Sequence, residues 1–347
     1  MSSSPVYYLH VPAKNALNVR FATEWQPIVL GPALHASATG GTATVYGLNQ
    51  PASLARYALK LYNKDRLAEF QTPEYHRKLR IISTLATLGA GELQAFALSR
   101  PFVSWPLFLA YTQPVHASKN LAGFVTPYFR NAKSLAYYVN RRMRAKYYPK
   151  ATDQHVAAVA GQIAYDLNQL HYNPPAYRTL SNITFGDLSL NNILVNRDTY
   201  QSYFLDADSY QYISNDRTNA LASGHTTPEY RSRAAAIAQS KKQPTPLFTP
   251  NSDNEALAIL IFHLLVDNNH PWRIQGTHGD LTPEECMVKG LYPYAKSHQH
   301  MAPEHAASLY RALPIAIQNA FTQAFTTATP PSAQNWSSLL SEYRRYL

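Results

Sequence analysis

Residues 184–196 read TFGDLSLNNILVN, a run of short polar side chains that turns apolar at Ile193. Asp187 stands five positions before Asn192, and a strand-like segment follows at once. One interpretation is an ordinary loop in which each polar residue caps a turn, a common role for Asp and Asn. The other is a loop that offers oxygen atoms to a metal ion and accepts a proton. The surrounding sequence decides between the two.

The loop lies between a predicted helix and a predicted hairpin. The helix covers 152–173, with Thr152 as its N-cap and an apolar residue at every third or fourth position. After the loop, the strand "NILV", the turn "NRDTYQ" and the strand "SYFLDAD" follow. This order brings Asp187, Asn192 and Asp206 to one end of the same sheet. Oxygen-only sites of this kind suit Mg²⁺, with water and substrate phosphates as further ligands.

The rest of the chain divides into a strand-rich part and a helix-rich part. Alternating patterns predict strands in "TATVYGL" and "RYALKLY", and 73–89 has helical spacing between Pro73 and Gly89. From about 130 onward helices dominate. "SDNEALAILIFHLLVDNN", which opens with Ser252 and Asp253, predicts a buried helix, and 241–252 predicts a long surface loop.

Composition excludes several classes of protein. The 347 residues are 46% hydrophobic, and no apolar run reaches the length of a membrane span. No secretory signal is expected in "MSSSPVYYLHVPAKN", and the single cysteine, Cys286, can form no internal disulfide. We therefore expect a cytoplasmic protein without a membrane partner.

The net charge is +10, and the densest cluster of basic residues is "RRMRAKYYPK" at 141–150. This cluster reads either as a solvated helix end or as a docking patch for an acidic partner or for nucleotide phosphates. Nucleic acid is not an expected partner, because no zinc finger, RNP-like strand or basic zipper accompanies the cluster.

Six motifs in order resemble those of protein kinase catalytic domains. They are "ATGGTATVY" with Gly40, Gly41 and Val45, the strand lysine Lys60 in "ALKLY", "FGDLSLNN" with Asp187 and Asn192, Asp206 in "LDADS", "TPE" at 227–229, and Asp253 at the start of the buried helix. The resemblance covers about 30–340. It implies an α+β, bilobal protein-kinase-like fold, with an N-terminal extension at 1–29, a β-rich N-lobe at 30–125 and a mainly helical C-lobe at 126–347.

Further motifs are similar to a bacterial branch of stand-alone Ser/Thr kinases, those of tellurite-resistance-associated phosphorylation triads. The shared segments are "GGTATVY", "SWP", "AGFVTP", "GDLSLNN", "DADSYQ", "SDNEALAILIFHLL" and "HPW". In that branch the kinase gene often lies beside genes for a metal-dependent phosphatase and a von Willebrand factor A-type protein. The resemblance therefore implies ATP and a protein substrate as partners, the substrate being a candidate product of a neighbouring gene.

The resemblance also implies roles for single residues. Backbone N–H groups at Gly40 and Gly41 would approach phosphates, Val45 and Val125 would contact the nucleotide, and Lys60 would bind the phosphates while Glu74 holds it in place. Asp206 and Asn192 would bind Mg²⁺ or Mn²⁺, with Asp208 as a further ligand or a turn cap. Asp187 would orient and deprotonate the attacking hydroxyl.

The chain departs from the common kinase pattern at several positions. Phe185 and Gly186 replace the usual histidine and arginine, Ser189 replaces a lysine, and Ala207 follows the metal-binding aspartate. Such an arginine usually binds a phosphorylated activation loop, so that mode of switching is not expected here.

Three functions stay open at this point. The first is an active Ser/Thr protein kinase, the function the sequence favours. The second is a pseudokinase or nucleotide-binding scaffold, against which the intact polar set argues. The third is a small-molecule phosphotransferase of the aminoglycoside or choline kinase type, which shares the loop "GDLSLNN". Against it, "TPEY" and the helix from Asp253 resemble the peptide-docking half of protein kinases.

Overall fold

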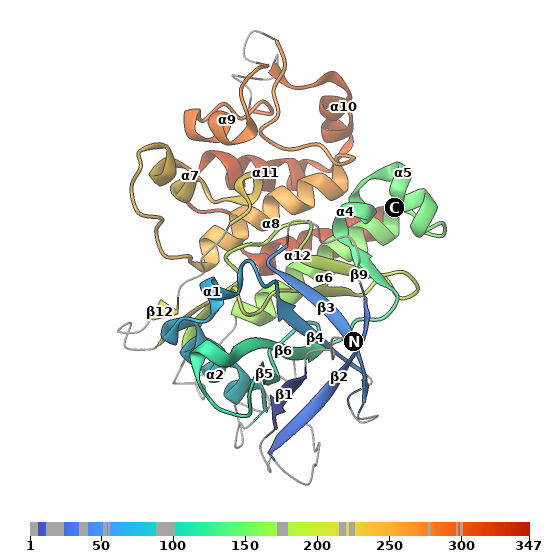
Figure 1. Cartoon of the computed structure of the whole chain (residues 1–347). Helices are drawn as coiled ribbons and strands as arrows, with labels where there is room; N and C mark the ends of the chain where they lie inside the picture. The colour runs from blue at the N-terminus through green and yellow to red at the C-terminus, as the bar shows by residue number, and fades with distance from the viewer. Residues whose placement is uncertain are drawn as a thin grey trace. The chain divides into compact units, whose positions relative to one another are not determined.

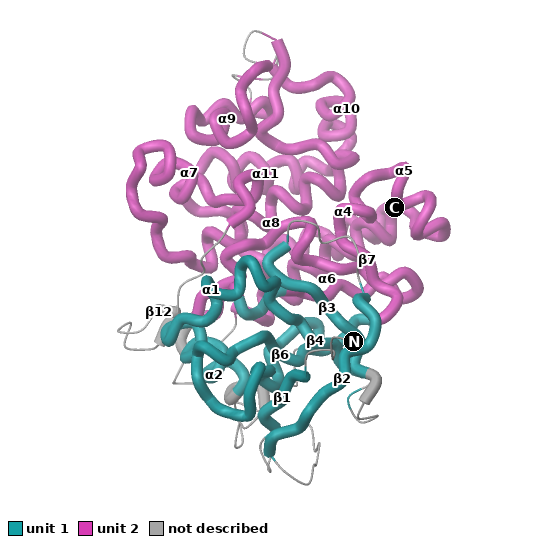
Figure 2. The backbone as a smooth tube through the Cα atoms, in the orientation of Figure 1, with its two compact units in different colours: residues 1–129, 206–208 teal, residues 130–205, 209–347 magenta. Residues whose placement is uncertain are grey.

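A computed structural model of the chain places helices and strands in two compact units (Figures 1 and 2). Unit 1 comprises Met1–Phe129 with Asp206–Asp208, and unit 2 comprises Arg130–Leu205 with Ser209–Leu347. The structure describes residues 6–11, 24–34, 41–50, 54, 56–87, 101–171, 180–214, 220–221, 226–276, 279–295, 298 and 301–347.

Unit 1 is built on a closed six-stranded barrel in the order β1-β2-β3-β4-β6-β5. Its strands are β1 (Tyr7–His10), β2 (Trp25–Ala33), β3 (Ala43–Gln50), β4 (Tyr57–Tyr62), β5 (Phe108–Tyr111) and β6 (Leu121–Pro127). All neighbours are antiparallel, and β1 closes the barrel by pairing with both β2 and β5. Part of the segment predicted as an N-terminal extension thus contributes a strand.

The central strand β4 carries Lys60, which lies opposite Val45 on β3 and Phe124 on β6. Five of the six residues of β4 are buried, because the strand has neighbours on both sides. Gly123 on β6 permits this pairing, since a Cβ atom there would lie 2.0 Å from the carbonyl oxygen of Lys60. The close approach of the β4 and β6 backbones fixes the position of the Lys60 backbone, and so the point from which its side chain extends.

The helices described in unit 1 are α1 (Leu67–Phe70) and α2 (Pro73–Thr87). They pack on the barrel through an aromatic core made of Tyr62, Phe70, Leu79, Leu109, Tyr111, Leu121 and Phe124. The ring of Tyr62 stacks on that of Phe70, with centroids 4.0 Å apart and planes 8° apart. This core ties the end of β4 to both helices.

Unit 2 is mainly helical. Its helices are α4 (Leu135–Val139), α5 (Arg141–Tyr147), α6 (Asp153–His171), α7 (Arg233–Ser240), α8 (Pro250–Leu265), α9 (Pro283–Lys289), α10 (Glu304–Ala312), α11 (Ile315–Thr326) and α12 (Ala333–Tyr343). Helix α8 is buried around nearly its whole circumference and packs against α6, α7 and α11, while α12 lies along α6 (Figure 1). Among the described residues no helix has the length and apolar character needed to cross a membrane.

Short strands of unit 2 form two three-stranded sheets, β10-β9-β7 and β12-β11-β8. Their bounds are β7 (Ala132–Ser134), β8 (Leu180–Thr184), β9 (Ile193–Asn196), β10 (Ser202–Phe204), β11 (Gln211–Ser214) and β12 (Ala220–Leu221). The antiparallel hairpin β9–β10 follows directly on the loop with Asp187 and Asn192, which confirms the hairpin predicted there. Short 3-10 turns also connect or end the described helices and strands: η2 (Ser118–Asn120), η3 (Pro228–Tyr230) and η5 (Arg344–Tyr346).

The start of α8 differs from the prediction. The helix begins at Pro250, with Thr249 as N-cap in a capping box with Ser252, so Ser252 and Asp253 lie inside its first turn. The loop predicted over 241–252 therefore ends three residues earlier, and Phe248 within it is buried rather than exposed. Proline at the first helical position was the available signal, because its fixed φ suits that position.

Candidate functional site

In unit 1 the ammonium group of Lys60 lies between two carboxylates. Its Nζ is 2.9 Å from Oδ1 of Asp206 and 2.9 Å from Oδ1 of Asp208, and only 12% of the lysine side chain is exposed. Burial alone would lower the pKa of Lys60, but the two carboxylates outweigh it and raise the pKa above its usual value. Lys60 is therefore a fixed positive charge.

The two aspartates differ in exposure and in backbone conformation. The Asp206 side chain is 44% exposed, whereas that of Asp208 is 5% exposed. Asp206 also adopts a positive φ of 57°, which is uncommon outside glycine but tolerated by Asp. The two aspartates, separated by one residue, both contact the same lysine.

Asp208 is saturated by donors from its own unit. Besides Lys60, it accepts a hydrogen bond from Oη of Tyr75 at 2.7 Å and one from Oη of Tyr62 at 3.3 Å, both on Oδ2. Burial raises the pKa of Asp208, but Lys60 and the Tyr75 hydroxyl outweigh it and hold the pKa below its usual value. Because the Asp208 side chain is only 5% exposed and both of its oxygens bind protein donors, this geometry does not support the prediction of Asp208 as a metal ligand.

The predicted contact between Glu74 and Lys60 also requires a correction. Glu74 is exposed in the first turn of α2, and the lysine contacts Asp206 and Asp208 instead. The next residue of the helix, Tyr75, is the one that points into the site. The sequence predicts a carboxylate of α2 beside Lys60, whereas in the structure α2 contributes the Tyr75 hydroxyl and Asp208 contributes the carboxylate.

In unit 2 the loop after β8 brings Asp187 and Asn192 together. The Asn192 side-chain nitrogen donates to Oδ2 and to the backbone oxygen of Asp187, each at 2.9 Å. The other carboxylate oxygen of Asp187 accepts from the backbone N–H of Thr227 at 2.6 Å. Thr227 belongs to the "TPE" motif, so that motif fixes the orientation of the Asp187 carboxylate.

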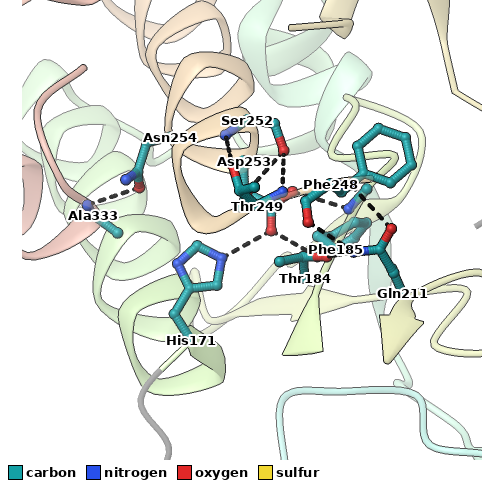
Figure 3. A network of polar contacts seen from close by, with 11 residues as sticks. His171, Thr184, Phe185, Gln211, Phe248, Thr249, Ser252, Asp253, Asn254 and Ala333 are labelled. Carbon is teal, nitrogen blue, oxygen red and sulfur yellow. Dashed lines mark hydrogen bonds and ion pairs between the residues drawn. The ribbon is translucent and has the colours of Figure 1, made fainter. Parts of the chain in front are cut away.

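Asp253 holds the backbone of the same loop (Figure 3). This carboxylate is 2% exposed and accepts from the backbone N–H groups of Phe185 at 2.6 Å and Gly186 at 2.9 Å. Nε2 of His171, the last residue of α6, lies 2.8 Å from its Oδ2. Gly186 has φ of 75°, a left-handed conformation that glycine adopts without strain.

The remaining contacts of Figure 3 fix the start of α8. The side chain of Gln211 donates to the Phe248 carbonyl at 2.7 Å and accepts from the Phe248 N–H at 2.9 Å. Asn254 accepts from the N–H of Ala333 at 3.0 Å, which ties α8 to the first residue of α12. The helix that carries Asp253 is therefore held at both sides of its first turn.

Several predicted residues take no part in these contacts. Gly40 lies outside the described residues, Gly41 is exposed and accepts from Asn63 through its carbonyl, and Val45 and Val125 lie on strands that flank β4. The structure brings Lys60, Asp206 and Asp208 together in unit 1. It separately brings Asp187 and Asn192 together in unit 2.

Three side chains of the site escaped the sequence argument: Tyr62, Tyr75 and His171. Tyr62 could have been found, since residues two apart on a strand share a face and Tyr62 follows Lys60 by two positions. Tyr75 and His171 carry no such signal, because one phenol or imidazole on a helix is more often part of the core.

Comparisons with known proteins point to kinases. The chain is 25% identical over 259 residues to "Protein kinase YegI" of Escherichia coli strain K12, which covers 71% of this chain and 37% of that protein. It is 24% identical over 321 residues to the protein of the same name from E. coli O157:H7, covering 89% of this chain and 44% of that protein. The chain thus spans less than half the length of these curated relatives. No protein-family model matches it.

Proposed function

We propose that the chain is an ATP-dependent protein kinase with a bilobal kinase fold, in which units 1 and 2 are the two lobes. It transfers the γ-phosphate of ATP to Ser or Thr hydroxyls of a protein substrate. The observation that carries this proposal is the Lys60–Asp206 ion pair, 2.9 Å long, because it joins a strand lysine to the aspartate after the β9–β10 hairpin. The similarity to proteins named protein kinase supports the same conclusion.

Unit 1 carries the groups suited to a nucleoside triphosphate. Lys60 stays charged between its carboxylates and offers N–H donors to phosphate oxygens. Val45 lies on β3 opposite Lys60, and Gly41 comes just before that strand. A glycine there permits the backbone to approach a phosphate closely. ATP is the ligand that this set of groups fits best.

Unit 2 carries the groups suited to the acceptor hydroxyl. The Asp187 carboxylate is oriented by the Thr227 N–H and by Asn192, and its loop is held by Asp253. A carboxylate fixed in this way can orient an alcohol and take up its proton as the phosphoryl group moves. The "TPE" motif, whose Thr227 N–H contacts Asp187, is the proposed binding site for the substrate peptide.

Mg²⁺ or Mn²⁺ is the proposed metal. In unit 1, Asp206 offers the more exposed of the two carboxylates on Lys60. In unit 2, Asn192 donates to Asp187 through its side-chain nitrogen, so its amide oxygen is the atom suited to a metal. Across the described ranges, no three His, Cys, Asp or Glu side chains are grouped to hold a metal ion. Phosphates and water would thus complete the coordination, as Mg²⁺ prefers. When bound, the metal would neutralise part of the negative charge of the phosphates.

The finer assignment follows the bacterial triad kinases. The motifs "DADSYQ" and "HPW" support this branch, and a product of a neighbouring gene, such as a phosphatase or a von Willebrand factor A-type protein, is the proposed substrate. We propose a cytoplasmic location, consistent with one buried cysteine.

The test combines binding and phosphoryl transfer. ATP with Mg²⁺ should raise the melting temperature of the wild type, and Asp206→Ala should remove the metal-dependent part of the shift. Asp187→Ala should keep the shift but lose phosphoryl transfer to a protein substrate by 10²-fold or more, on the order expected for a catalytic base. Transfer by Asp187→Ala at the wild-type rate would contradict the assignment.

A further inference from the structure

The carboxylate of Asp208 is built into unit 1 as an anchor rather than as a ligand site. The Asp208 side chain is 5% exposed, and a buried carboxylate is stable only where a cation and hydrogen-bond donors compensate it. Lys60 supplies the cation at 2.9 Å, and the phenols of Tyr62 and Tyr75 supply the donors. Lys78, also buried, adds a second positive charge in its neighbourhood.

The two phenols are themselves fixed. Their oxygens lie 2.8 Å apart, so they form one hydrogen-bonded pair that meets Oδ2 of Asp208. Tyr62 stacks on Phe70 of α1, and the Tyr75 ring meets Phe70 edge-on at 5.1 Å. The pair therefore connects β4, α1 and α2 to one carboxylate oxygen, with rings that the aromatic core holds in place.

Asp206 and Asp208 share the lysine but not their surroundings. Asp206 is 44% exposed and can exchange the lysine for another cation, whereas Asp208 is closed in by protein donors. If Asp206 bound a metal ion, Asp208 would remain as the anion that keeps the Lys60 ammonium group in position. The difference in burial therefore gives the two carboxylates different roles: Asp206 is accessible to other cations, and Asp208 holds the lysine.

We propose that Asp208 is the residue that positions Lys60 for the nucleotide, and that the hydroxyl of Tyr75 couples α2 to it. This inference rests on the proposed function. Helix α2 then contributes a neutral hydroxyl to the site, and no carboxylate of α2 is needed to hold the lysine. Asp208 and Tyr75 are positioning residues, since they act on the ligand only through Lys60.

The first test measures ligand binding. In Asp208→Asn the dissociation constant for ATP should rise at least about tenfold with and without Mn²⁺, while the Mn²⁺ concentration at half-saturation stays that of the wild type. Tyr75→Phe should raise the ATP constant about threefold or more, and Glu74→Gln and Tyr137→Phe, on exposed parts of α2 and α4, should leave it unchanged. A shifted Mn²⁺ midpoint in Asp208→Asn would show that Asp208 binds the metal and would contradict the proposal. Weaker ATP binding in Glu74→Gln would show that a carboxylate of α2 holds Lys60, which would also contradict it.

The second test needs no nucleotide, so it separates this inference from the proposed function. A double-mutant cycle of Lys60→Met and Asp208→Asn, followed by urea unfolding, should give a coupling of at least about tenfold in the unfolding equilibrium constant. The matched cycle of Lys60→Met with Glu74→Gln should give none. Failure of ATP to bind would overturn the proposed function alone, whereas absence of coupling between Lys60 and Asp208 would overturn the anchor.

Discussion

At the scale of single residues, the backbone conformation at position 186 explains why a glycine stands there. The φ of 75° at Gly186 lies in the left-handed region, and in this conformation its N–H donates to the buried carboxylate of Asp253. Gly186→Ala and Gly186→Arg should each lower the free energy of unfolding by about 1–2 kcal/mol, the cost of a left-handed L-residue. Urea unfolding at neutral pH measures the change.

The control for this prediction is Gly186→Asn, since asparagine tolerates the left-handed region better than other residues with a side chain. It should lose less stability than Gly186→Ala. Equal losses in the two variants would mean that space around the Cβ atom, and not the φ angle, explains the glycine.

A second residue links stability to pH. Asp166 on α6 is 2% exposed, and burial raises its pKa to about 7, although Gln162 and Ser202 donate to its oxygens at 2.8 and 2.9 Å. The folded protein thus holds this proton at pH values where the unfolded chain has released it. The stabilising contribution is complete below about pH 4, falls as the pH rises to about 7, and is absent above, a change of about 4 kcal/mol.

Asp166→Asn should remove this pH dependence, because the amide resembles the protonated acid in shape and charge. The wild type should melt at a lower temperature at pH 8 than at pH 5, and the variant should show a smaller decrease. Parallel melting profiles for the two proteins would show that Asp166 does not change its charge in that interval.

The sequence motifs single out residues that the structure brings into contact, while the roles assigned to these residues stay predictions. The contacts of Lys60 with Asp206, of Asp187 with Asn192, and of Asp253 with the loop at 185–186 all involve residues that the motifs single out. The predicted contact of Glu74 with Lys60 was wrong, since helical spacing alone does not say which of two adjacent helix residues faces the site. The donor that saturates Asp208 comes from such a neighbour.

At the scale of elements, the pairing of β4 with β6 depends on one glycine. A Cβ atom at Gly123 would lie 2.0 Å from the Lys60 carbonyl oxygen, so Gly123→Ala must push the strands apart. We expect a loss of about 2 kcal/mol or more in the free energy of unfolding, as for other overpacked sites. Weaker ATP binding should accompany it, because the backbone of Lys60 moves.

Gly161 in α6 is the matched control. A Cβ atom there would meet Cβ of Leu340 at 3.5 Å, an ordinary contact, and alanine is the better helix former by about 1 kcal/mol. Gly161→Ala should therefore stabilise the protein slightly. If both variants lost equal stability in urea unfolding, close strand approach would not be the reason for Gly123.

Elements with a strong period were predictable and their ends were less so. The helix predicted from Thr152 begins at Asp153, and the helix predicted from Pro73 begins at Pro73. The start of α8 was placed late because Asp253 was taken for an N-terminal residue, whereas its side chain bonds a distant loop. A local pattern cannot distinguish a cap from a long-range contact of the same residue type.

At the scale of the molecule, closure of the barrel joins distant parts of the chain. Leu9 on β1 is fully buried and pairs with Gln26 on β2 and Ala110 on β5. Leu9→Ala should lower the free energy of unfolding by about 2–5 kcal/mol. Val29→Ala, at a position 66% exposed on β2, should change it by less than about 0.5 kcal/mol.

Urea unfolding of the two variants side by side is the measurement. A loss at Leu9 as small as that at Val29 would mean that β1 adds little to unit 1. The sequence could not predict the closure, since β1 is only four residues long and its partner β5 lies about 100 residues away. The division into a strand-rich and a helix-rich part was predictable, because composition and period change near residue 130.

The closed barrel also limits how other proteins can be recognised. Many partners bind by adding an extended peptide as one more strand to a sheet, through backbone groups that an edge strand leaves unpaired. Each of the six described strands of the barrel has a neighbour on both sides. A protein that docks on this barrel must therefore be selected by side chains and connecting segments, and exchange of its surface residues, not of its backbone register, would change the partner.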